Sequence, residues 1–314
     1  MPNPIGRPHL KSMAHQQSFK QTRAAGPQKR LRPAPASSRP QRPIDVTQVT
    51  EWQDGSVSRV NDYLVGEEPL EIRIGNRPIS VTMRTPGHDL ELAAGFLLTE
   101  GVINGSDQIA SLRQIATRGS KGNVVRVNLQ PDVAFETTRL KRNFTVSSSC
   151  GLCGKASIDA VRVRGIARPN PGLRIAPDIL CLLPEALRSA QTLFGRTGGP
   201  HAAGLFDTMG RLAAVREDVG RHNAVDKLIG WALLEKRLPL RESVLLVSGR
   251  GSFEIVQKAL VAGVPIVACI SAPSSLAVQL AWEFGLTLIG FLRGKRFVCY
   301  TGEERMRLSR TPGR

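Results

Sequence analysis

Short apolar runs alternate with amphipathic segments over the last 75 residues of the chain. SVLLVSG, VPIVACIS, LTLIGFLR and RFVCYTG have the length and composition of strands, whereas SFEIVQKALVAG and SSLAVQLAWEFG have helical periodicity. Helices placed between short apolar strands require crossover connections, which favour a mainly parallel sheet covered on both faces. The pattern therefore predicts an α/β fold.

The preceding part of the chain, residues 46–145, is richer in strand patterns. EPLEIRIGNRPISVTMRT alternates apolar and polar residues on both sides of Gly75-Asn76, which predicts a hairpin. NVVRVNLQ and RNFTVSS predict two further strands. HDLELAAGFLLTEGVI predicts a helix with one apolar face, formed by Leu90, Ala93, Ala94 and Leu97.

The N-terminal segment has a different composition. Residues 1–44 contain nine Lys and Arg, no Asp or Glu, and eight of the 21 prolines, which predicts a disordered basic arm. The remaining chain carries +8 of the formal +17 charge, which suits an anionic ligand or partner. The predicted organisation is an arm (1–44), a smaller β-rich subdomain (45–145), an α/β domain (146–303) and a tail (304–314).

Three classes of protein fit the sequence poorly. The chain has no apolar stretch near the ~18 residues that span a bilayer, and no N-terminal apolar core of a secretory signal. Aromatic residues make up only 5%, without a groove-reading motif, so we expect no specific nucleic-acid binding. An odd set of five cysteines without a disulfide framework predicts a reducing, cytoplasmic location, with organelle import as the minor alternative.

The cysteines differ in their surroundings. Cys269 and Cys181 lie in apolar runs and are expected to pack, and Cys299 is left open. Cys150 and Cys153 form a Cys-x-x-Cys pair in SSSCGLCGKAS. A structural zinc site needs four ligands, and no second such pair exists. We expect no permanently bound metal; a site that adds His201 and His222 is the alternative.

The pair lies where a thiolate is stabilised. Cys150 and Cys153 precede a possible helix start at Gly154, where unpaired N–H groups and the helix dipole favour a negative charge. Lys155 adds a positive charge nearby. Such thiols carry sulfur as a persulfide or exchange disulfides, so a dithiol oxidoreductase is the second candidate.

Glycine-rich and charged blocks follow. Gly198-Gly-Pro-His201 predicts a turn that presents an imidazole, and Asn223 is expected to cap the helix after the charged run 216–223. Ser248-Gly-Arg-Gly251 lies between a strand and a helix, which is a favourable anion site, and ISAPSSLAVQLA repeats the arrangement. Solvated helix entrances are the simpler explanation for each block alone. Together they predict a phosphate or nucleotide pocket at the carboxyl edge of the sheet.

These motifs, taken in order, give a specific resemblance. They are Cys150-Gly-Leu-Cys153-Gly-Lys, Gly-Gly-Pro-His201, Glu217-Asp-Val-Gly-Arg-His222-Asn-Ala-Val-Asp-Lys227, Ser248-Gly-Arg-Gly-Ser-Phe-Glu254 and Gly290-Phe-Leu-Arg293. With them the chain resembles the FdhD family of formate dehydrogenase accessory proteins, from about residue 47 to 302.

The resemblance implies a sulfur carrier, or sulfurtransferase. Such a protein takes sulfur from a cysteine desulfurase as a persulfide, on the first cysteine of the pair, here Cys150. It passes the sulfur to the molybdenum cofactor (Mo-bis-molybdopterin guanine dinucleotide) before that cofactor enters formate dehydrogenase. The resemblance also implies a homodimer and a fold similar to cytidine deaminases, although the deaminase His-x-Glu signature is missing. The implied cofactor-binding residues are Phe291, Leu292, Arg293, Gly294, Lys295 and Arg296.

Two points stay open. Cys153 would release the sulfur if it attacked the persulfide, so it either stays out of line or acts afterwards as a relay or resolving thiol. A delivery chaperone that binds the cofactor without sulfur chemistry is the main alternative function; it would not need either cysteine.

Overall fold

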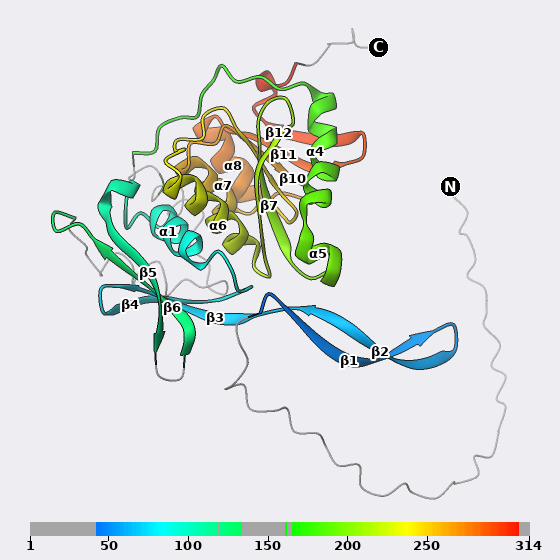
Figure 1. The fold of residues 1–314 in the computed structure, drawn as a ribbon. Helices are drawn as coiled ribbons and strands as arrows, with labels where there is room; N and C mark the ends of the chain where they lie inside the picture. The colour runs from blue at the N-terminus through cyan, green and yellow to red at the C-terminus, as the bar shows by residue number, and fades with distance from the viewer. Residues whose placement is uncertain (1–41, 118–119, 134–160, 162–164, 308–314) are drawn as a thin grey trace, which may run out of the picture. The chain divides into compact units, whose positions relative to one another are not determined.

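The computed structural model describes residues 42–117, 120–133, 161 and 165–307. The predicted arm, the strand RNFTVSS and the Cys150–Cys153 pair lie outside these residues, as does the end of the tail. The predicted α/β class is confirmed as a mixed α/β fold with more than one sheet (Figure 1). No helix among the described residues is both long and apolar enough to span a bilayer.

The larger sheet has six strands in the order β12-β11-β10-β9-β7-β8. Its centre, β9 to β11, is parallel as predicted, and antiparallel strands extend it on both sides. Crossover helices α7 and α8 connect the parallel strands and cover them, which accounts for the short, wholly apolar sequences of β9 and β10. The strand bounds are β7 His201–Phe206, β8 Leu212–Asp218, β9 Val244–Val247, β10 Ile266–Cys269, β11 Thr287–Arg293 and β12 Arg296–Thr301.

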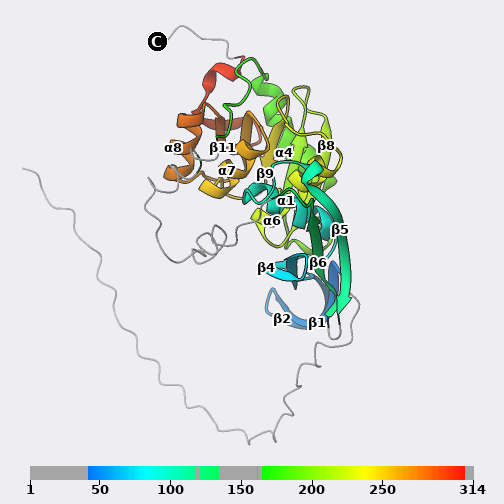
Figure 2. The same ribbon diagram turned by 90° about the vertical axis from the view of Figure 1, so that its left-hand side faces the viewer.

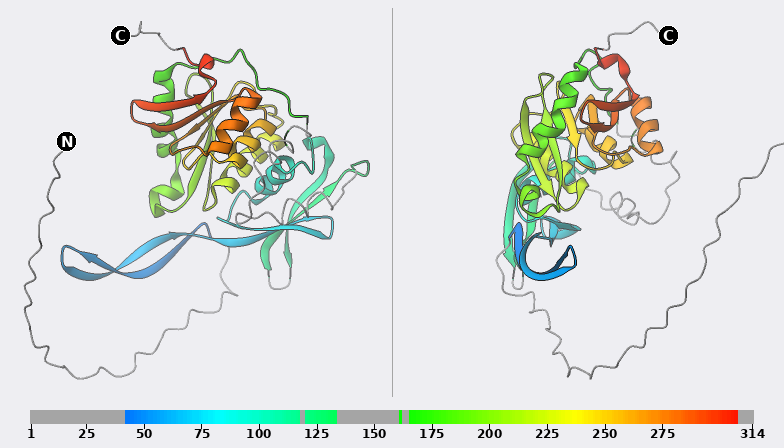
Figure 3. Two further views of the ribbon diagram at one scale, coloured as in Figure 1. Left: turned by 180° about the vertical axis from the view of Figure 1, so that it is seen from behind. Right: turned by 90° about the vertical axis from the view of Figure 1, so that its right-hand side faces the viewer.

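Helices cover both faces of this sheet. Leu245 and Val247 of β9 belong to a core shared with α6, α7 and α8, whereas Val244 and Leu246 belong to a core shared with α4. Figure 2 and the right-hand view of Figure 3 show the two helical layers with the sheet between them. The helix bounds are α1 Asp89–Thr99, α4 Pro177–Ala190, α5 Thr192–Thr197, α6 Arg221–Leu234, α7 Phe253–Val261 and α8 Ser275–Phe284, with 3-10 turns η1 Ser106–Gln108 and η2 Glu303–Arg305.

The N-terminal half forms a four-stranded sheet in the order β4-β3-β6-β5, and a separate pair, β1-β2. The hairpin predicted at Gly75 is confirmed between β3 and β4, and Gly75 has a φ of 58° that suits glycine. The pair β1-β2 turns at Asp54-Gly55, a hairpin signal that the predictions above do not include. The bounds are β1 Ile44–Gln53, β2 Ser56–Val65, β3 Glu68–Ile74, β4 Arg77–Arg84, β5 Ile109–Thr117 and β6 Ser120–Leu129.

Helix α1 packs closely against α6, although the two are far apart in the sequence. Two glycines make the close approach possible: a Cβ on Gly95 would lie 1.9 Å from the carbonyl oxygen of Asp226, and one on Gly230 would lie 1.8 Å from that of Glu91. Both contacts are with backbone, which cannot move aside as a side chain can. The crossing joins the N-terminal half of the chain to the helix that leads into the site described below.

An ion pair also joins α1 to β8. Arg216 donates from Nη2 to Glu91 Oε1 at 2.8 Å and from Nε to Oε2, and His88 lies 3.1 Å from Glu91 Oε2. Burial alone would raise the pKa of Glu91, but the hydrogen bonds and charges of Arg216 and His88 lower it to about 2. The folded protein therefore holds this carboxylate ionised at pH values where the unfolded chain takes up a proton.

We expect this ion pair to make the free energy of unfolding depend on pH in the acid range. Its contribution is complete above the ordinary pKa of 4.5 and is lost as the pH falls from there through about 2. Glu91→Gln should remove about 1–2 kcal/mol of this pH-dependent free energy of unfolding, because solvent partly screens the half-buried pair. Urea unfolding of both proteins between pH 7 and 2 measures it. Parallel curves for wild type and variant would contradict the assignment.

Candidate functional site

The glycine-rich and charged blocks of the second half meet at one edge of the six-stranded sheet. Ser248 follows β9, and its N–H donates to the carbonyl of Ala202 at 2.9 Å. His201 opens the antiparallel β7 and pairs in register with Asp218, the last residue of β8. Because β7 runs antiparallel to both neighbours, its beginning lies beside the ends of β8 and β9. The turn that follows β8 leads directly into α6, whose first two residues are Arg221 and His222.

His201 is paired with a serine. The Ser248 hydroxyl oxygen accepts a hydrogen bond from Ala202 N–H at 2.9 Å and lies 3.4 Å from His201 Nδ1. Either group of this pair can donate, because the ring nitrogen that carries the hydrogen depends on the tautomer of His201. Burial lowers the pKa of His201, and the Arg221 charge lowers it further, against the attraction of Asp218. The imidazole of His201 is therefore neutral near pH 7.

His222 makes a second histidine–serine pair. Its Nε2 lies 3.1 Å from Ser252 Oγ and 3.8 Å from Glu254 Oε2. Burial and the charge of Arg221 lower the pKa of His222 to about 4, against the opposing effect of Glu254. Both histidines are therefore neutral near pH 7. They can donate to or accept from a ligand without adding charge.

Two glycines allow close packing at this edge of the sheet. The backbone of Gly249 lies under His201 and Arg221: a Cβ there would be 3.4 Å from His201 Nδ1 and from Arg221 Cδ. A Cβ on Gly251 would lie 2.7 Å from Cys269 Sγ. Cys269 is fully buried, and burial raises the pKa of its thiol to about 12, which confirms that it is a packing residue.

The loop after β10 lies directly beside the loop after β9. Gly251 N–H donates to the carbonyl of Ala272 at 3.2 Å, and Ser274 N–H donates to the carbonyl of Gly251 at 2.9 Å. Ser274 caps α8 by accepting from Ala277 N–H at 3.3 Å. The two strand ends that the sequence singled out are thus neighbours.

The stretch 291–296 borders the same loops. Phe291 N–H donates to the carbonyl of Ser271 at 3.2 Å, and Arg293 Nε donates to the carbonyl of Ile270 at 3.1 Å. Phe291 has a φ of 52°, unusual for a bulky residue, and its side chain is exposed. Gly294 turns the chain between β11 and β12 at a φ of 54°.

The six predicted cofactor-binding residues differ in accessibility. The side chain of Leu292 is buried in the core shared with α4, so it can support the hairpin but presents nothing to a ligand. The other five are exposed, and three of them are cationic: Arg293, Lys295 and Arg296. Together with the exposed Arg250 after β9, they make this edge of the sheet basic.

A buried ion pair holds the turn between β8 and α6. Asp218 is fully buried, and its Oδ2 lies 2.7 Å from Lys227 Nζ and accepts from Thr85 N–H at 3.1 Å. Its Oδ1 accepts from Gly220 N–H at 2.8 Å and from Asn223 Nδ2 at 3.1 Å. Asp218 thus fixes the segment that presents Arg221 and His222.

The predicted cap by Asn223 is wrong. Helix α6 begins at Arg221 with Gly220 in the capping position, so Asn223 already lies in the first turn. Its Nδ2 instead donates to Met83 and Asp218. The sequence grouped Asp218 and Arg221 in one charged run and did not reveal that Asp218 has a structural role. Its ion-pair partner, Lys227, is nine residues away, and Thr85 lies in the other half of the chain.

The other predicted residues stand as follows. Cys181 lies inside α4, partly exposed, and Cys299 lies in β12 with its thiol 3.2 Å from the carbonyl of Thr301. Burial raises the pKa of Cys299 to about 11. No three His, Cys, Asp or Glu side chains within the described residues are grouped to hold a metal ion. A zinc site that includes Cys150 and Cys153 lies outside that part of the chain.

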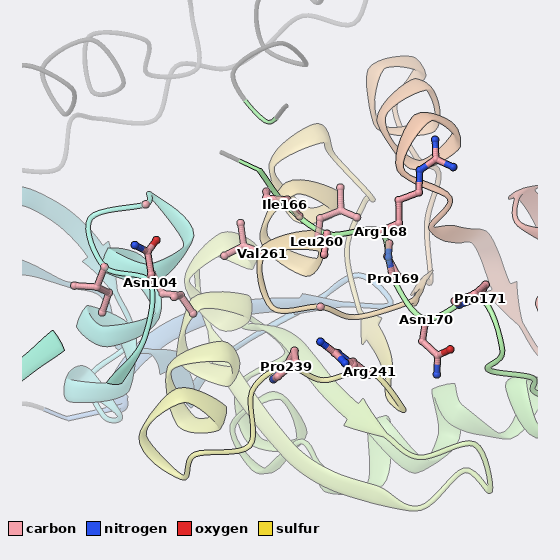
Figure 4. A pocket seen from close by; sticks show the side chains of 15 residues that line it. Asn104, Ile166, Arg168, Pro169, Asn170, Pro171, Pro239, Arg241, Leu260 and Val261 are labelled. Atoms are coloured by element: carbon pink, nitrogen blue, oxygen red, sulfur yellow. The ribbon is translucent and has the colours of Figure 1, made fainter. Parts of the chain in front are cut away.

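A pocket of about 880 Å³ lies at the opposite edge of the sheet (Figure 4). It is lined by the loops that precede β9 and β10, including Pro239, Arg241 and Gly263, and by residues 166–171. The carboxyl ends of the same strands carry Ser248 and Ile270, so this pocket is separate from the basic edge.

Comparison with known proteins finds one matching family model and several similar proteins. Residues 65–307 match the model of the FdhD/NarQ family. The "Sulfur carrier protein FdhD" of Streptomyces avermitilis is 54% identical, over 82% of this chain and 93% of that protein. The protein of the same name from Sulfolobus acidocaldarius is 41% identical over 84% and 99%.

A solved structure shows the same fold. A crystal structure described as that of a formate dehydrogenase accessory protein from Desulfotalea psychrophila matches with a TM-score of 0.66. The match covers 84% of this chain and 99% of that one, at 24% identity.

Proposed function

The chain belongs to the FdhD/NarQ family, and on that basis we propose that it is a sulfur carrier that serves formate dehydrogenase. The observation that carries the proposal is the identity of about half of all aligned residues with sulfur carrier proteins, over nearly their whole length. The delivery-chaperone alternative has no comparable support.

The sulfur is proposed to travel on Cys150. The thiolate of Cys150 attacks the outer sulfur of a persulfide on a cysteine desulfurase; a bond from Cys150 to that sulfur forms, the donor's S–S bond breaks, and the donor cysteine leaves as a thiolate. Glycines at 151 and 154 allow a large partner to approach. Cys153 is proposed to stay out of line with the loaded sulfur, or to act after its transfer.

The recipient is proposed to be the molybdenum cofactor in its bis-guanine-dinucleotide form, which carries two pyrophosphates and is therefore large and anionic. Arg293, Lys295 and Arg296 supply cations for phosphate, and the glycine-supported loops allow a close backbone approach. Phe291 offers an exposed ring beside them, suited to stacking. The charge of these residues suits such a substrate.

The finer features implied by the resemblance remain proposals of the same kind. They are a cytidine-deaminase-like arrangement of the sheet, a homodimer and a cytoplasmic location. The deaminase His-x-Glu signature is missing from the sequence, so the proposed fold relationship does not extend to deaminase chemistry.

Sulfur loading tests the proposal directly. We expect wild-type protein, incubated with a cysteine desulfurase and cysteine, to gain one sulfur atom on the peptide that contains Cys150. Cys150→Ala should lose the gain and fail to restore formate dehydrogenase activity to a strain that lacks the carrier. Mass spectrometry of the peptide and enzyme assays of the strain measure the two effects.

Two variants serve as controls. Cys181→Ala changes a cysteine of α4 and should load normally, and Cys153→Ala should still accept sulfur on Cys150. If Cys150→Ala loads as wild type does, the carrier cysteine is misassigned. If the double variant of Cys150 and Cys153 still activates formate dehydrogenase, the chaperone alternative replaces the sulfur carrier.

A further inference from the structure

The strands β1 and β2 form a two-stranded ribbon that is a sheet of its own (Figure 1). They pair in register from Ile44 and Val65 at the base to the turn at Asp54. Directly opposed residues of an antiparallel pair lie on the same face, and successive residues of one strand lie on opposite faces. One face, named the ribbon face below, therefore carries the even-numbered residues 44–52 of β1 and the odd-numbered residues 57–65 of β2.

Large apolar side chains of the ribbon face are exposed to water. In the outer pair, near the tip, Trp52 is 71% exposed and Val57 is 68% exposed. In the inner pair, near the base, Val46 is 55% exposed and Tyr63 is 42% exposed. An isolated two-stranded ribbon is only marginally stable in water and needs an apolar surface to pack against. Exposed apolar side chains gathered on one such face indicate an interaction surface.

The order of side chains along the ribbon face is the same from either end. The inner and outer pairs are apolar, and the two pairs between them are polar, Gln48 with Asn61 and Thr50 with Arg59. If two ribbons stack face to face and antiparallel, the outer pair of each copy covers the inner pair of the other. The polar pairs then meet each other midway, and Arg59 lies over side-chain amides rather than over a second arginine. A face with this symmetry is self-complementary, as the interface of a two-fold dimer requires.

Charges at the two ends of the ribbon favour the same arrangement. The tip carries Glu51 and Asp54, and residues 51–57 include no Lys or Arg. At the base, the guanidinium of the exposed Arg196 in α5 lies 5.4 Å from the centre of the Tyr63 ring. Antiparallel stacking brings the acidic tip of each copy to Arg196 of the other, whereas parallel stacking places tip against tip. Complementary charges of this kind fix the register of an interface.

We propose that the ribbon face binds the ribbon face of a second copy of this chain, antiparallel and about a two-fold axis. The inference rests on the homodimer of the proposed function and names its interface. A ribbon of this length is about 33 Å long and about 10 Å wide, so two stacked faces cover roughly 700 Å² before protruding side chains are added. Interfaces of this size are typical of transient complexes. We therefore expect monomers and dimers in exchange at micromolar protein concentrations.

Sedimentation equilibrium of the full-length protein tests this surface. Trp52→Ala should raise the dissociation constant of the dimer by about tenfold or more, because a central aromatic side chain dominates the energy of an interface. Trp282→Ala is the matched control, since Trp282 lies in α8 and is 78% exposed. The control should leave the dissociation constant unchanged. In a Trp282→Phe background, dilution of the dimer should shift the tryptophan emission to longer wavelength as Trp52 returns to water.

An exchange of charges tests the antiparallel register independently of Trp52. Glu51→Arg and Arg196→Glu should each weaken the dimer, because each places like charges together across the interface. The variant that carries both substitutions should recover most of the lost affinity. Both side chains are exposed, so neither substitution is expected to unfold the protein. Two single variants that weaken the dimer without recovery in the double variant would contradict the antiparallel register.

Two results would overturn the proposal. A wild-type protein that stays monomeric into the millimolar range excludes the second copy as the occupant of the ribbon face. A dimer that is equally stable in wild type and in Trp52→Ala assigns the interface to another surface. Sulfur loading of Cys150, measured in the same preparations, should be normal in Trp52→Ala. Loading therefore separates failure of the carrier function from failure of the interface.

Discussion

Asp218→Ala is expected to destabilise the protein by about 3–5 kcal/mol, because it leaves Lys227 as an unpaired charge in the interior. Both side chains are almost wholly buried, and Nζ lies 2.7 Å from Oδ2. The variant also loses the acceptor for Gly220 N–H, which holds the turn before α6. We therefore expect the free energy of unfolding to fall. Urea unfolding measures the effect.

Glu71→Ala is the matched control for this prediction. Glu71 lies 2.8 Å from Arg73, nearly the same separation, but both side chains are about a quarter exposed. A pair of this kind contributes at most about 1 kcal/mol. If the two variants lose similar stability, burial does not set the strength of the Asp218–Lys227 pair, and the argument from Asp218 to the geometry of the site is wrong.

Gly230→Ala is expected to cost about 3 kcal/mol or more, although alanine ordinarily favours a helix over glycine. The added Cβ would lie 1.8 Å from the carbonyl oxygen of Glu91 and 2.8 Å from Gly95 N, so α1 and α6 would have to separate. Separation would open the core that joins the two halves of the chain. Thermal and urea unfolding should both show the loss.

Gly195→Ala provides the comparison. Gly195 lies in helix α5, where an added Cβ would meet no atom within 4 Å and φ is not positive, so the same substitution should be neutral or stabilise by up to about 1 kcal/mol. A Gly230→Ala protein as stable as Gly195→Ala would show that the α1–α6 crossing tolerates an added carbon and can shift.

Local patterns were sufficient for most elements of the second half. β9, α7, β10, α8, β11 and β12 follow the order predicted from apolar runs and helical periodicity. Such patterns succeed here because β9 and β10 are buried on both faces, and each helix has one face against the sheet. The hairpin at Gly75 was equally clear, since alternation and the turn residues indicated the same structure.

Local sequence patterns predicted only part of the candidate site. The sequence identified the blocks around His201, Arg221 and Ser248 and placed a phosphate site at the strand ends, but it assigned Asn223 a capping role that the true start of α6 rules out. Chemistry at Cys150 was inferred from spacing and resemblance, and its geometry lies outside the described residues.

The sequence by itself determined the α/β class, the family and the cysteine pair, because periodicity, spacing and motif order are properties of neighbouring residues. Tertiary structure alone decided that His201 meets Ser248, that Asp218 meets Thr85 and Lys227, and that Arg221 Nε finds no acceptor among the described residues. These facts depend on strand pairing and on the α1–α6 crossing, which join segments more than 130 residues apart. No local pattern encodes such contacts, since they arise only when the buried surfaces of distant elements pack together.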